Sequence, residues 1–341
     1  MHTTGLYKAM LHYIIKCGHI FCCVLRALRG AIFLAGIKIF YGMGRGKRRL
    51  IGMVLLEHMG DIVASEPILR SLRRRHPRDY LIWVTQRVYG DLIRHHSELD
   101  RVLSVQCYTE WKILQRLGLF DDSYDLHFEG YHCPVCGIYF GKKTGDRSLN
   151  FKNYYDRGNL LQVFSDSAGL PVENVSPRIY IPEAVVAKVA SWNIPAPYIV
   201  IHGRSRQALR GWQEEKWILL AQRILQKSNY SVVEIGLEPV LSNQANPRIL
   251  NYCAQTSLLE MAEIIRKSRL FVGVESGPAH LANAVGTFGV IITGKYFGFS
   301  DYLPYSGAYA DGSNARILRH EGPAAENDLE VVWKAVSEKL T

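Results

Sequence analysis

Three short segments of the 341-residue chain combine a glycine with polar side chains directly after an apolar run. In the first, Gly60 and Asp61 follow the apolar residues 50–56, a run with the length and composition of a buried strand. The glycine allows a turn. The acid then stands at the start of a helix, where the helix dipole stabilises a carboxylate. Asp61 can serve there as a plain helix cap or as a general base.

The second segment carries hydroxyl and basic groups at the end of an apolar run. Residues 198–202 predict a strand, and a glycine turn then leads through Ser205 and Arg210 to a helical pattern at 214–227. Anionic phosphate is a natural ligand at such a place, because the start of a helix offers unpaired backbone N–H groups. A surface loop with solvated arginines would have the same sequence.

The third segment is the most specific of the three. Residues 270–274 predict a strand. The turn that follows consists of Glu275, Ser276 and Gly277, and a proline suited to the first turn of a helix comes next. The backbone N–H groups of this turn are expected to point outward toward a phosphate, and His280 could reach the same anion. A helix cap with a packed histidine is the simpler alternative.

Strands alternate with helices through the chain beyond residue 50. The expected strands lie at 50–56, 80–85, 102–105, 124–128, 198–202, 231–235, 270–274 and 290–292. The expected helices lie at 62–75, 88–95, 111–117, 153–169, 214–227, 258–267, 279–285 and 328–340. This alternation predicts an α/β fold with two Rossmann-like, doubly wound domains. Because such sheets bind ligands at the carboxyl ends of their strands, we expect the two domains to face a shared cleft.

A proline-rich stretch separates the two halves. Five prolines lie between residues 170 and 197, which is typical of an interdomain crossing. We therefore predict five parts. They are a basic N-terminal segment at 1–49, a first domain at 50–170, a linker at 171–197, a second domain at 198–325 and a closing helix at 326–341.

The basic charge of the chain is concentrated in its first 50 residues. The net charge is +10, and nine Lys or Arg without any acid lie in this segment, which leaves about +1 for the rest. On a helix, apolar side chains would surround a stripe of basic ones. The stripe consists of Lys8, His12, Lys16, His19, Arg26 and Arg29. The longest uncharged runs, of nine and eight residues, are too short for a membrane span, and no secretory cleavage site follows them.

Such a helix is expected to lie in the headgroup layer of an anionic membrane, with the basic residues 44–49 adding to the attraction. The alternative is a helical extension packed on the protein itself. Nucleic acid is not an expected partner, because the basic run carries no recognition motif.

The seven cysteines have no disulfide-framework spacing, so we predict free thiols in a reducing compartment. Cys133 and Cys136 form a single C-x-x-C pair beside His132. A zinc site needs a second ligand pair, and none follows at the usual spacing. We therefore interpret this stretch as a loop with incidental cysteines, and we expect no metal site and no cofactor.

Together the three segments resemble glycosyltransferase family 9, the ADP-heptose:lipopolysaccharide heptosyltransferases. The resemblance covers about residues 50–310. It depends on the Gly60-Asp61 pair, on the Arg-Gly-Trp stretch within 201–217 and on the motif at 275–282. The family implies a GT-B fold, with a first domain for the acceptor and a second for the nucleotide sugar. It also implies that Asp61 is the catalytic base and that the other two segments hold the nucleotide diphosphate.

The resemblance leads to a set of expected donor-binding residues. They are Ser205, Arg210, Glu238, Thr256, Glu275, Ser276, Gly277 and His280. Within this set, Glu238 is a candidate for the ribose hydroxyls, and helix capping is the simpler account of Thr256. Glu275 and Arg210 replace the Asp and Lys common in the family, which leaves the exact donor open. No acceptor-binding residue is assigned; basic candidates are Arg87, Lys142, Lys143 and Arg147.

The reaction implied is a direct, inverting and metal-independent sugar transfer, with ADP-heptose favoured as donor and a lipopolysaccharide or other lipid-linked glycan as acceptor. The expected location is cytoplasmic, peripheral on the inner face of the inner membrane. The first alternative is a hexosyltransferase of O-antigen, capsule or protein glycosylation that uses a UDP- or GDP-sugar. A non-catalytic nucleotide-binding scaffold is disfavoured by Asp61, and a nucleotide-sugar epimerase remains a further alternative.

Overall fold

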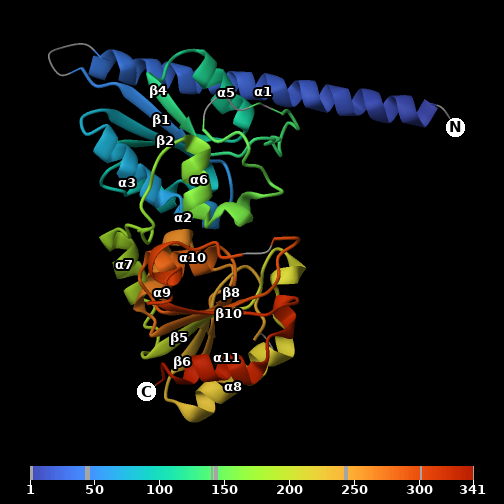
Figure 1. Cartoon of the computed structure of the whole chain (residues 1–341), viewed down its shortest axis with the longest axis vertical. Helices are drawn as coiled ribbons and strands as arrows, with labels where there is room; N and C mark the ends of the chain where they lie inside the picture. Colours follow the sequence, from blue (N-terminus) through green and yellow to red (C-terminus); the bar gives the residue numbers. More distant parts are fainter. Residues whose placement is uncertain are drawn as a thin grey trace.

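The computed structural model describes residues 3–42, 47–139, 141, 145–241, 245–299 and 302–340, and the side chains from residue 18 onward. Within these ranges the chain forms two parallel sheets, each with its own helices, stacked along the long axis of the molecule (Figure 1). The predicted α/β fold with two doubly wound halves is confirmed.

The first sheet has four parallel strands in the order β3-β2-β1-β4. Their bounds are β1 Leu50–Val54, β2 Tyr80–Gln86, β3 Arg101–Val105 and β4 Asp122–Asp125. The helices of this half are α2 Met59–Ala64, α3 Glu66–Arg75, α4 Asp91–Arg94, α5 Tyr108–Arg116 and α6 Leu160–Ala168. The chain order reverses between β1 and β4, so a ligand site is expected outside the carboxyl end of β1.

The second sheet has six parallel strands in the order β10-β9-β8-β5-β6-β7. Their bounds are β5 Tyr198–His202, β6 Ser231–Glu234, β7 Ile249–Asn251, β8 Leu270–Val274, β9 Gly289–Thr293 and β10 Ala315–Arg319. The helices are α8 Glu214–Lys227, α9 Leu258–Lys267, α10 Gly277–Ala284 and α11 Leu329–Ser337. Here the order reverses between β5 and β8, so the second and third segments both lie at a switch point.

Several predicted elements differ in detail from the observed ones. The helix expected at 62–75 is two helices, because Pro67 in the first turn of α3 lacks the N–H that a continuous helix needs. The helix expected at 153–169 is a 3-10 turn followed by α6, and the fourth strand begins at Asp122. The 3-10 turns lie at Arg87–Tyr89, Tyr154–Arg157, Ala208–Arg210, Gly307–Tyr309 and Ala324–Glu326.

Three observed elements were not predicted. Strands β7 and β10 lie at the two edges of the second sheet, and neither has the buried apolar pattern of the central strands. Helix α7 (Glu183–Ala190) lies inside the proline-rich stretch and packs against α9. Pro182 directly precedes this helix, so proline marks a helix start there rather than a loop.

The N-terminal segment is a single helix, α1 (Thr3–Gly42), and its N-terminal part extends beyond the first half of the molecule (Figure 1). One face of α1 packs against α5, where Cys23, Ala27 and Leu34 are buried in one apolar cluster with Trp111 and Leu114. The alternative of a helix packed on its own protein therefore holds for this face.

The prediction that Arg26 belongs to a lipid-facing stripe of basic side chains is wrong. Its Nε lies 2.6 Å from Oε1 of the buried Glu110, so this charge binds the protein. Lys38, farther along α1, lies with its Nζ 2.9 Å from Asp121 Oδ1. The part of α1 whose side chains are described, Gly18–Gly42, is long and apolar enough to cross a membrane, with a mean hydropathy of 2.0. The interrupting charges therefore do not exclude a span. Residues 43–46, which include part of the predicted basic patch, lie outside the described residues.

Candidate active site

The two switch points face each other, and the start of α2 lies against the start of α10 (Figure 1). A Cβ atom at Gly60 would lie 2.8 Å from His280 Cδ2, and one at Gly277 would lie 2.2 Å from Met59 Cε. The buried His280 ring has little room to move, so Gly60 is needed for the close approach of the two halves, whereas the flexible end of Met59 could move away from a side chain at residue 277. The first and third sequence segments, which are far apart in the chain, form one site.

Asp61 lies in the first turn of α2, as predicted. Its Oδ2 accepts a hydrogen bond from the backbone N–H of His58 at 3.1 Å, which is a helix-capping contact. About 24% of the side chain stays exposed, so capping leaves the carboxylate within reach of a ligand. Burial raises the pKa of Asp61 above its usual value, although the charges of His280 and His58 oppose the shift.

Glu275 is the first residue after β8 and is almost fully buried. Its Oε2 lies 2.6 Å from Arg210 Nη1, its Oε1 lies 3.8 Å from His280 Nε2, and it accepts a hydrogen bond from the Tyr302 hydroxyl. Burial raises the pKa of Glu275, but the interaction with His280 and the charge of Arg210 outweigh burial and hold the pKa below the usual value. Glu275 is therefore a buried anion that holds Arg210 and lies near His280, whose charge also acts on Asp61.

Arg210 is held by aromatic rings as well as by Glu275. Its guanidinium carbon lies 4.1 Å from the ring centre of Tyr296 and 5.5 Å from that of Tyr302. Among the described residues, its buried Nε has no hydrogen-bond partner. Buried N–H groups are normally paired, so this unpaired donor is an exception within the site.

Sequence reasoning missed the two tyrosines, because the loop after β9 carries no motif. The only signal was a run of aromatic residues at 296–305. It also missed Arg206, whose Nη1 lies 2.8 Å from His58 Nε2 and thereby links the second half of the molecule to the first.

Glu57 adds a second carboxyl group beside Asp61. Burial, and next the charge of Asp61, raise the pKa of Glu57 to about 8. The possible ligand atoms of Glu57, His58 and Asp61 lie within 4.8 Å of one another, which is close enough to hold a metal ion. The metal-independent reaction therefore stays a prediction.

Replacing Glu57 with glutamine is expected to stabilise the fold at alkaline pH. Since the folded-state pKa of about 8 exceeds the ~4.3 of an unfolded glutamate, the carboxyl group favours folding below the unfolded pKa, and this contribution is lost as the pH rises through 8. One pKa unit corresponds to ~1.4 kcal/mol, an upper limit at a partly exposed site. In thermal unfolding, the variant should match the wild type near pH ~4 and melt higher near pH ~9. If the variant and the wild type had equal Tm values at both pH values, the raised pKa of Glu57 would be contradicted.

The family model of glycosyltransferase family 9 (heptosyltransferase) matches residues 158–294. The predicted resemblance to this family is confirmed. The family 9 match includes Arg210, Glu275 and His280, whereas Asp61 and the strands of the first sheet precede it. A comparison with curated protein sequences finds no match.

Solved structures share the fold of this chain over most of its length. A family 9 glycosyl transferase from Veillonella parvula is 16% identical, with a TM-score of 0.66 over 86% of this chain and 97% of that one. The ADP-heptose lps heptosyltransferase II of E. coli is 15% identical, with a TM-score of 0.65 over 86% and 98%. The E. coli heptosyltransferase WaaC with ADP is 14% identical, with a TM-score of 0.58 over 85% and 99%. The chain therefore has the GT-B fold of these enzymes.

Two further residues of the predicted donor site lie at the switch point of the second sheet. Ser205 is half-buried, and its hydroxyl accepts a hydrogen bond from the N–H of Gln207 at 3.4 Å. Ser276 precedes α10, and its hydroxyl donates to the Val274 carbonyl at 3.0 Å. Both hydroxyl groups therefore hold the turns from which backbone N–H groups could reach a phosphate.

The other two predicted donor residues lie farther along the second sheet. Glu238 is exposed in the loop after β6. Thr256 does not cap α9; the next residue, Ser257, does so with Glu260. The Oγ1 atom of Thr256 is buried and has no hydrogen-bond partner within the described ranges.

The acceptor side is less defined. Arg87 is exposed, and Arg147 is exposed with its Nε 3.9 Å from Glu129 Oε2. Lys142 and Lys143 lie outside the described residues.

Proposed function

We propose that this protein transfers a sugar from a nucleotide diphosphate, with ADP-heptose favoured, onto a lipid-linked glycan such as lipopolysaccharide. The observation that carries the proposal is the placement of Asp61, at the start of α2, beside His280 and Glu275 at the start of α10. A base from one half therefore meets the anion-binding start of a helix from the other. The family match supports transfer chemistry, and the ADP and ADP-2-deoxy-2-fluoro heptose named with solved structures of the E. coli heptosyltransferase WaaC favour an ADP-linked heptose as donor.

In the proposed reaction, Asp61 accepts the proton of an acceptor hydroxyl as its oxygen attacks the anomeric carbon. The bond from that carbon to the diphosphate oxygen breaks, and the configuration inverts. The departing negative charge is stabilised by the backbone N–H groups at the start of α10 and by Arg210. The raised pKa of Asp61 suits this role, because a carboxylate of higher pKa is a stronger base.

The nucleotide is expected to raise the melting temperature of the full chain. A ligand that binds only the folded state adds ~2.7 kcal/mol of stability at a concentration 100 times its Kd. Thermal unfolding with ADP, UDP and GDP should therefore give the largest shift with ADP. A larger shift with UDP or GDP would favour the hexosyltransferase alternative, and no shift with any nucleotide would count against a transferase.

We also propose that α1 holds the enzyme on the inner face of the inner membrane. The face of α1 opposite α5 is apolar and exposed: Phe21, Leu25, Leu28, Ile32, Ile39 and Phe40 are 64, 46, 49, 74, 61 and 75% exposed. Burying such a face in acyl chains removes it from water, and a lipid-embedded acceptor would then lie at high local concentration. Because Arg26 and Lys38 bind the protein, the apolar face carries more of this association than basic charge does.

Full-length protein is therefore expected to co-sediment with anionic vesicles, and high salt should weaken this only in part. Ile32→Glu combined with Phe40→Glu should abolish it. The matched control is Val331→Glu on α11, which adds charge at another exposed apolar position. If the control lost vesicle binding to the same extent, or if the double variant kept it, α1 would not be the anchor.

A further inference from the structure

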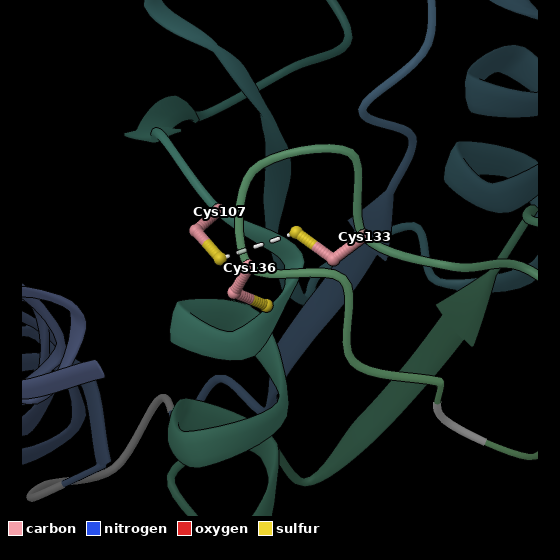
Figure 2. A group of neighbouring side chains, drawn as sticks. All are labelled: Cys107, Cys133 and Cys136. Carbon is pink, nitrogen blue, oxygen red and sulfur yellow. Dashed lines mark hydrogen bonds between the residues drawn. The ribbon is translucent and has the colours of Figure 1, made fainter. Parts of the chain in front are cut away.

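Three cysteine side chains converge beside the start of α5 (Figure 2). Cys107 directly precedes α5, and Cys133 and Cys136 come from the long loop between β4 and α6. Their Sγ atoms all lie within 4.8 Å of one another, and those of Cys107 and Cys133 are 3.2 Å apart. Around a tetrahedral zinc ion with Zn–S bonds of ~2.3 Å, neighbouring sulfur atoms are about 3.8 Å apart. The Cys107–Cys133 separation is somewhat shorter than this value, and no separation within the group exceeds 4.8 Å.

A fourth cysteine reaches the same group from α1. Cys23 is fully buried on α1 and interacts with the side chain of Cys107, although its Sγ lies outside the group of three whose atoms are all within 4.8 Å of one another. The adjacent Cys22 is exposed. Cys107 therefore supplies in space a third ligand that the linear spacing lacks, and Cys23 is the candidate for the fourth.

Hydrogen-bond donors surround these sulfur atoms. The backbone N–H groups of Val135 and Cys136 donate to Cys133 Sγ, as expected of a tight C-x-x-C turn whose two thiolates share a metal ion. Thr109 Oγ1 lies 3.0 Å from Cys136 Sγ, and Arg26 Nη2 lies 3.4 Å from Cys23 Sγ. Donors of this kind offset the negative charge of thiolate ligands. Cysteines that merely fill space as small apolar residues do not require them.

The loop that carries Cys133 and Cys136 has little regular secondary structure that could hold it in place. Between β4 and the 3-10 turn at Tyr154–Arg157, its described residues form only two isolated bridges, Glu129 with Asn150 and His132 with Tyr139. Long irregular segments inside a compact domain are uncommon without a specific stabilising feature. A metal ion would tie this loop to α5 and to α1 at once.

We propose that Cys23, Cys107, Cys133 and Cys136 form a tetrahedral thiolate site for one divalent metal ion. Four thiolates in this geometry suit Zn²⁺ or Fe²⁺, and we favour Zn²⁺ as a structural ion. The site joins α1 to the first half of the molecule, so it fixes the apolar helix relative to the catalytic residues. It does not depend on the transferase activity.

The first test measures metal in the full chain, purified under reducing conditions with Zn²⁺ in the growth medium. Elemental analysis should find about one zinc per chain, and a mercurial thiol reagent should release it to a coloured chelator. Replacement by Co²⁺ should give the intense thiolate-to-cobalt absorption of a tetrahedral site. This measurement uses the wild-type chain, so it does not depend on the folding of a variant. If about one iron per chain were found instead, the thiolate site would be supported with Fe²⁺ as its ion. Absence of both metals, together with no thiolate-to-cobalt absorption, would overturn the proposal.

The second test compares variants. Cys133→Ser should lower bound metal severalfold, and Cys23→Ser should weaken the cobalt absorption and make the metal easier to chelate. The matched controls are Cys22→Ser, next to Cys23 on α1, and Cys253→Ser, a buried cysteine of the second half. Both controls should keep the metal. Loss of metal in the controls equal to that in Cys133→Ser, or a Cys107–Cys133 disulfide found by mass spectrometry in the reduced preparation, would refute the site.

Discussion

Asp61→Asn is expected to lower turnover by about 10²–10⁴-fold while nucleotide affinity stays nearly unchanged. The asparagine side chain keeps the shape and can still accept the hydrogen bond from the His58 N–H, but it cannot take a proton from the acceptor. Because burial raises the pKa of Asp61, the ionised carboxylate costs stability at neutral pH. The variant should therefore melt at or above the wild-type temperature, so a loss of rate would not reflect unfolding.

Asp91→Asn is the matched control for this variant, because Asp91 also lies in the first turn of a short helix of the same half but is well exposed. It should keep wild-type turnover. Turnover of Asp61→Asn within about threefold of the wild type would remove Asp61 from the mechanism, since general-base catalysis contributes at least ~10²-fold.

Gly277→Val is expected to weaken nucleotide binding by roughly 10- to 150-fold, which corresponds to the loss of one charge-assisted hydrogen bond of about 1.5–3 kcal/mol. The added side chain would lie beside the first N–H groups of α10, where we place the diphosphate. Calorimetric titration of the nucleotide measures this directly.

The structure adds a second reason why Gly277→Val could fail, because its Cβ atom would lie 2.2 Å from Met59 Cε of the facing half. The double variant Gly277→Val with Met59→Ala separates the two causes, since it removes the clash but keeps the side chain at the helix start. If the double variant binds nucleotide as weakly as the single one, the phosphate lies at α10. If it regains wild-type affinity, the effect came from packing between the halves, and the diphosphate lies elsewhere.

The parts of the site that local sequence could predict are those formed by consecutive residues. A strand, a glycine and a polar side chain at a helix start define both Asp61 and the Glu275–His280 motif, and the parallel sheets bring these ends together.

The remaining features depend on packing between distant segments, which has no local signal. Tyr302 donates to Glu275 from a loop without a motif. Cys23 reaches Cys107 only because one face of α1 packs on α5. Helical periodicity places Arg26 on a basic stripe. Because α1 packs on α5, however, the folded chain pairs Arg26 with Glu110.

We propose that the protein transfers a sugar from a nucleotide diphosphate at the two facing helix starts, with Asp61 as the base. The most direct measurement incubates the full chain with ADP-heptose and lipid-linked glycan from its own host, and quantifies released ADP and glycosylated lipid together. Wild-type protein is expected to form both in equal amounts, and Asp61→Asn is expected to form almost none, although it still binds ADP. Equal product formation by the two proteins, or ADP release that never yields a glycosylated lipid, would contradict this proposal.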